Sequence, residues 1–92
     1  MAERRTQYEI YWEILVFCKD PPRTFTSIIN RCDLNSKTGQ DYIGFLCAKG
    51  YLSQIKDGEK FLYVATDRAR EYIALFTELY RNLFDAIPGY RL

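Results

Sequence analysis

The chain of 92 residues has the length of one small domain, and its formal net charge is only +1. Hydrophobic residues make up 48% of it and aromatic residues 16%, which excludes a disordered tail and predicts a globular fold with a small core. The near-neutral charge excludes a broad cationic field.

No apolar segment approaches the roughly 18 residues of a membrane span, and no signal-peptide pattern follows the charged N-terminus. We therefore expect a cytoplasmic protein of one domain, residues 1–92, that binds no membrane. The chain has no histidine and three cysteines: Cys18, Cys32 and Cys47. Their number and spacing fit neither a disulfide framework nor a zinc site, so we expect buried thiols and no metal or other cofactor.

The first predicted helix covers residues 6–19. Thr6 is a suitable N-cap, and Glu9 follows at the spacing of a capping box. Pro21 and Pro22 end the helix, since proline restricts the residue before it and has no backbone N–H. Apolar residues cover two sides of this helix, which predicts that it lies between two other elements.

A short second helix is expected over residues 24–31 and a third over residues 35–49, followed by Gly50 as its C-terminal stop. The connection between them is short enough for a helix-turn-helix. Gly39 costs the third helix up to about 1 kcal/mol relative to alanine, which predicts that another helix approaches closely there.

The third helix has two unlike sides. The apolar side carries residues at helical spacing: Gly39, Tyr42, Ile43, Leu46 and Cys47. The other side is polar or small: Lys37, Gln40, Asp41, Gly44 and Ala48. We expect the first side to face the core and the second to be open.

Two short runs follow, residues 51–55 and 61–65, both rich in leucine, β-branched or aromatic residues. The turn between them contains Asp57-Gly58, which predicts a β-hairpin. This turn region, residues 56–60, carries two lysines and two acids and is therefore balanced in charge.

The last predicted helix covers residues 66–87, about 33 Å in length, and Pro88-Gly89 stops it. Its apolar residues follow a heptad seam: Ala69, Ile73, Phe76, Tyr80, Leu83 and Ile87. Five more broaden it: Tyr72, Leu75, Leu79, Phe84 and Ala86.

Five of these apolar residues should lie beyond the reach of the short first helix: Phe76, Tyr80, Leu83, Phe84 and Ile87. We therefore expect a homodimer whose interface holds six residues of the last helix: Ile73, Phe76, Tyr80, Leu83, Phe84 and Ile87. The alternative is a monomer in which the last helix folds back on the first.

Catalytic motifs are missing from the sequence, which has no histidine base, nucleophile elbow, phosphate-binding loop or paired carboxylates. We expect no enzymatic activity.

The stretches 46–52 and 63–70, with Asp57-Gly58 between them, resemble the winged helix-turn-helix pattern of lysine-glycine, apolar pair, wing turn, tyrosine strand and threonine-capped helix. Residues 34–46 and the long last helix resemble small archaeal winged-helix DNA-binding proteins that dimerise through an antiparallel coiled coil. The resemblance covers about residues 7–84. It implies a mainly α fold with a β-hairpin (α+β), a core over residues 6–65, a dimerisation helix over 66–87, and a regulatory or chromatin-type protein that binds double-stranded DNA.

In such a domain the third helix enters the major groove. Its polar start then supplies the expected contacts to DNA: Ser36, Lys37, Thr38 and Gln40. Gln40 can pair with adenine, and Lys37 can contact phosphate or guanine. Further phosphate contacts are expected from four basic residues: Arg23, Arg31, Lys56 and Lys60. Arg4 and Arg5 are candidates for a short basic arm.

Two other interpretations stay open. The polar start of the third helix can be a solvated first turn, and the chain can be a winged-helix module that binds protein instead of DNA.

Overall fold

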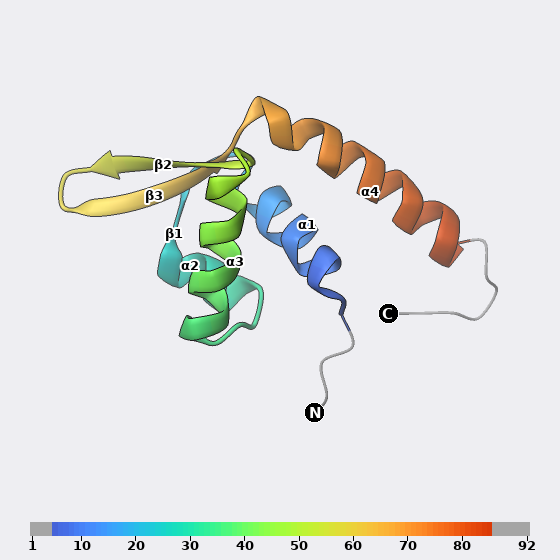
Figure 1. Cartoon of the computed structure of the whole chain (residues 1–92), viewed down its shortest axis with the longest axis horizontal. Coiled ribbons are helices and arrows are strands. Elements are labelled where there is room, and N and C mark those ends of the chain that lie inside the picture. The colour runs from blue at the N-terminus through green and yellow to red at the C-terminus, as the bar shows by residue number, and fades with distance from the viewer. Residues whose placement is uncertain (1–4, 86–92) are drawn as a thin grey trace.

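The computed structural model describes residues 5–85, and for residues 83–85 it describes the backbone alone. The elements, in chain order, are α1 (Gln7–Phe17), β1 (Arg23–Thr24), α2 (Phe25–Arg31), α3 (Ser36–Ala48), β2 (Leu52–Asp57), β3 (Lys60–Ala65) and α4 (Asp67–Asp85). Figure 1 shows α1 between the α2–α3 pair and α4, with the hairpin projecting away from the helices. The predicted α+β fold, mainly helical with a β-hairpin, is confirmed.

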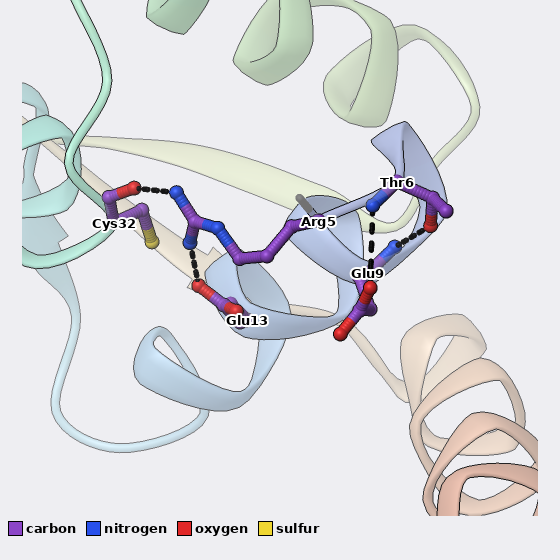
Figure 2. Close-up of polar contacts among 5 residues, drawn as sticks. All are labelled: Arg5, Thr6, Glu9, Glu13 and Cys32. Carbon is purple, nitrogen blue, oxygen red and sulfur yellow. Dashed lines mark hydrogen bonds and ion pairs between the residues drawn. The ribbon is translucent and has the colours of Figure 1, made fainter. Parts of the chain in front are cut away.

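Helix α1 begins at the predicted capping box. The Thr6 hydroxyl accepts a hydrogen bond from the Glu9 N–H at 3.1 Å, and the Glu9 carboxylate accepts one from the Thr6 N–H at 3.2 Å (Figure 2). Ile14 and Leu15 are fully buried, and α1 lies at the centre of the core. Its two apolar sides are explained by neighbours on both flanks (Figure 1).

The connection between α2 and α3 is tight. Asp33 adopts a positive φ of 57°, and the Leu34 N–H donates to the Ile29 carbonyl at 2.8 Å, which ends α2. A Cβ on Gly39 would lie 2.4 Å from Cγ2 of Ile29, which is closer than van der Waals contact allows. The predicted close approach of two helices at Gly39 is therefore confirmed.

The sheet has three antiparallel strands in the order β1-β3-β2. The hairpin β2–β3 turns at Gly58, whose φ is +65°. Strand β1 was not expected from the sequence. It has only two residues, Arg23 and Thr24, and pairs with Tyr63 and Leu62 of β3.

The core also buries two thiols. Cys18 and Cys32 are buried and free, whereas Cys47 is half-buried. Burial raises the pKa of the Cys18 thiol to about 12 and that of Cys32 to about 11. Among the described residues, no helix is both long and apolar enough to cross a membrane.

Helix α4 runs beside α1 and turns its heptad seam toward it. Ala69 is fully buried and Ile73 packs on the core. The Trp12 ring of α1 stacks on Phe76 and Tyr80, with ring centroids 5.4 Å and 5.1 Å away. The expectation that the first helix cannot reach Phe76 and Tyr80 is wrong, because one large indole ring extends the reach of α1.

The same helix carries apolar residues that the body does not cover. Leu75 is 63% exposed and Leu79 is 56% exposed. The side chains of Leu83 and Phe84, and all of Ile87, lie outside the described residues.

Candidate nucleic-acid interface

The first turns of α3 lie at the surface, as the sequence predicts. Asn35 caps the helix, since its side-chain oxygen accepts a hydrogen bond from the Thr38 N–H at 2.8 Å. Ser36, Lys37 and Gln40 are exposed, and Thr38 is half-buried. They are presented outward because Gly39, Ile43 and Leu46 are buried on the opposite side of the helix.

A hollow of about 470 Å³ separates α3 from the hairpin. Its lining comes from α2, α3, β2 and β3: Phe25, Gln40, Ile43, Gly44, Cys47, Leu52, Ser53, Gln54 and Tyr63. Gly44 lines this hollow and borders open space, because a Cβ built there would meet no atom within 4 Å.

Gln54 and Tyr63 form the hairpin side of the hollow, where the Gln54 amide donates to the Tyr63 hydroxyl at 3.0 Å. Sequence reasoning did not select either residue. Strand alternation was the available signal, because Gln54 is two residues from the buried Leu52 and so lies on the same side of the strand. The hollow thus brings Gln40 of the predicted site together with two hydrogen-bonding side chains of the hairpin.

The predicted basic residues fall into two groups. Lys56 and Lys60 are exposed on the hairpin. Arg23 and Arg31 gather instead around Phe17, with guanidinium carbons 4.1 Å and 5.8 Å from the ring centroid.

Arg23 is further tied to its own chain, because its Nε donates to the Phe17 carbonyl at 3.0 Å. Arg31 is exposed at the end of α2. The structure therefore leaves Arg31 more accessible to a phosphate than Arg23.

Arg5 is held by the body of the protein. Figure 2 shows its guanidinium between the Glu13 carboxylate, with which it forms an ion pair, and the Cys32 carbonyl, to which it donates at 2.6 Å. Arg5 therefore links α1 to the end of α2 and is not part of a loose basic arm. Arg4 lies outside the described residues.

Two helices in a tight helix-turn-helix, followed by a projecting hairpin and a long helix, define the winged-helix class of domain. The family model described as winged helix-turn-helix matches residues 4–83. The chain belongs to this winged helix-turn-helix family.

Solved structures of similar fold include known DNA-binding proteins. Sso10a-2, a DNA-binding protein from Sulfolobus solfataricus, is 26% identical with a TM-score of 0.73, over 89% of this chain and 88% of that one. The transcriptional regulator BldR from the same organism is 18% identical with a TM-score of 0.70, over 87% of this chain and 63% of that one.

A homodimeric winged helix-turn-helix DNA-binding domain, Mb0332 from Mycobacterium bovis, is 14% identical with a TM-score of 0.70, over 89% of this chain and 77% of that one. At such identity, BldR and Mb0332 share the fold alone. No curated protein sequence matches the chain.

Proposed function

We propose that this protein binds double-stranded DNA as a homodimer and acts as a transcriptional regulator or a small chromatin protein. The observation that carries the proposal is the exposed polar start of α3 beside an open hollow. Membership of the winged helix-turn-helix family and the similarity to Sso10a-2, described as a DNA-binding protein, support it.

In this proposal α3 enters the major groove. Gln40 forms two hydrogen bonds with an adenine, Lys37 contacts guanine or phosphate, and Ser36 and Thr38 donate to phosphate. The exposed positions of Ser36, Lys37 and Gln40 are compatible with these roles.

The phosphate contacts come from Arg31, Lys56 and Lys60, which are all exposed. Arg23 contributes its positive charge but not its Nε, which already donates to the Phe17 carbonyl. About four contacts per subunit correspond to a salt slope of about −3 to −4, which means weak binding by a single subunit at physiological salt. Two subunits double the contacts.

Helix α4 is the proposed dimer interface. Its inner side packs on α1, but Leu75 and Leu79 leave a large apolar area in water. Burying the exposed part of each would contribute about 1 to 2 kcal/mol. We place these two leucines at the centre of the contact, with Leu83, Phe84 and Ile87 of the expected interface beside them. Ile73, Phe76 and Tyr80, which the sequence also assigned to the interface, already pack on the core and on Trp12 of the same chain.

A gel-shift titration of duplex DNA at several salt concentrations tests the proposal. Lys37→Ala should reduce the salt slope by about 1, and Gln40→Ala should weaken discrimination between sequences by about 1 to 3 kcal/mol. Arg70→Ala is the control, because Arg70 is exposed on α4 and has no place in the proposed site. Failure to bind any duplex at low salt would instead support a protein-binding winged-helix module.

A further inference from the structure

The two sides of the hairpin, here called the wing (residues 52–65), differ in chemistry. Side chains alternate between the sides of a strand, so the register assigns each pair to one side. One side holds Leu52 with Ala65, Gln54 with Tyr63, and Lys56 with Phe61. The other holds Ser53 with Val64, Ile55 with Leu62, and Asp57 with Lys60. Leu52, Gln54 and Tyr63 of the first side line the hollow beside α3, whereas Ser53 alone of the other side does, so the first is the α3-facing side.

The register also separates the charges of the wing. Its sequence is balanced, but Asp57 and Lys60 pair on the far side. Within the described strands, Lys56 is the single charged residue of the α3-facing side, so this side is cationic and complements a polyanion. One lysine supplies only a weak attraction, so a wing that binds DNA needs a second contact beside Lys56.

Phe61 provides such a contact. It is 48% exposed, and its ring lies beside Lys56, whose Nζ is 5.9 Å from the ring centroid. Phe61 is two residue pairs closer to the hairpin turn than Tyr63. Figure 1 shows the hairpin projecting beyond the helices toward that turn. An aromatic ring at this place is unfavourable in water but can stack on a nucleic-acid base.

We propose that Phe61 is an apolar wedge, which inserts between two bases in the minor groove of bound duplex DNA and partly unstacks them. Lys56 contacts the adjacent phosphate and holds the strand beside the ring. Apolar side chains are known to act in this way in the minor groove. The inference rests on the proposed function, because α3 in the major groove brings the wing over the neighbouring groove.

Duplexes carrying 2-aminopurine at successive positions report the unstacking, since this base brightens when its neighbours no longer stack on it. At saturating protein, the wild type should raise the fluorescence at one step. Phe61→Ala should abolish the rise and weaken binding about ten-fold, while Phe61→Leu should keep part of both.

Ile55→Ala is the matched control. Ile55 lies on the far side of the same hairpin and is 39% exposed, so its truncation removes a comparable apolar group without reaching the α3-facing side. It should leave fluorescence and affinity unchanged. Thermal unfolding of each variant checks that the hairpin is intact, which is expected because both side chains are exposed.

The outcomes separate this proposal from the proposed function. If the wild type binds duplex through Lys37 and Gln40 but no position brightens, or if Phe61→Ala and Ile55→Ala behave alike, the wedge is refuted and DNA binding stands. If the wild type binds no duplex at all, the proposed function fails and the wedge fails with it.

Discussion

Trp12 of α1 donates a hydrogen bond from its indole N–H to the Thr77 hydroxyl of α4, at 3.0 Å and across 65 residues of sequence. The same indole stacks on Phe76 and Tyr80. Trp12 therefore docks the middle of the long helix on the body, next to the buried Ala69 and to Ile73, which packs on the core.

This docking predicts the cost of losing the indole. Trp12→Ala should lower the free energy of unfolding by about 3 kcal/mol, because the stacking surface and the hydrogen bond are lost together. Thr77→Val removes only the acceptor and should cost about 1 kcal/mol. Urea unfolding followed by circular dichroism measures both. A loss below about 0.5 kcal/mol for Trp12→Ala would mean that Trp12 does not hold α4 on α1.

The exposed side of α4 predicts a variant that separates the subunits. Leu75→Glu should convert the proposed dimer into a monomer, because a charge cannot be buried in an apolar contact without a partner. Ala74→Glu adds the same charge at an exposed position about 100° around the helix from Leu75 and should leave the dimer intact. Light scattering after size exclusion gives the mass. If Leu75→Glu still dimerises with unchanged affinity, the interface does not include Leu75.

The two glycines of α3 form a matched pair. Gly39→Ala should destabilise the protein, because the new Cβ would lie 2.4 Å from Ile29 Cγ2. The cost of this clash outweighs the gain in helix propensity. Gly44→Ala should stabilise it by up to about 1 kcal/mol, since nothing lies within 4 Å of that Cβ. Thermal unfolding compares the two variants. Stabilisation by both would show that α2 and α3 can shift to accommodate the extra methyl group at residue 39.

Buried thiols predict that stability falls at alkaline pH. In the folded protein the pKa is raised from 9.0 to about 12 for Cys18 and to about 11 for Cys32. Above pH 9 the unfolded chain loses protons that the folded chain keeps, so the free energy of unfolding should decrease as pH rises from 9 toward 12. Burial also raises the pKa of Tyr72 from 10.0 to about 12, which adds to the decrease in the free energy of unfolding above pH 10.

Denaturant unfolding at pH 7, 9 and 10.5 measures this dependence. Cys18→Ala should flatten it, because the variant lacks the thiol with the larger shift. A steep dependence that persists unchanged in Cys18→Ala would assign it to other groups.

Most element boundaries could be predicted from the sequence, because helix ends and tight turns depend on local chemistry. Thr6 and Asn35 cap their helices through their own side chains. Gly50 and Gly58 adopt the positive φ that their turns need. The exposure of the polar start of α3 could also be predicted, since the spacing of the apolar residues identifies the buried side of the helix.

The sequence by itself determined the helices, the hairpin and the outward side of α3. Only the tertiary structure decided what α4 packs against, because a heptad seam is equally suited to a helix of the same chain and to one of a second copy. Only the strand register assigned Lys56 and Phe61 to one side of the wing and Asp57 to the other. The pairing of β1 with β3 likewise joins residues far apart in sequence, and such contacts depend on how distant segments meet in space.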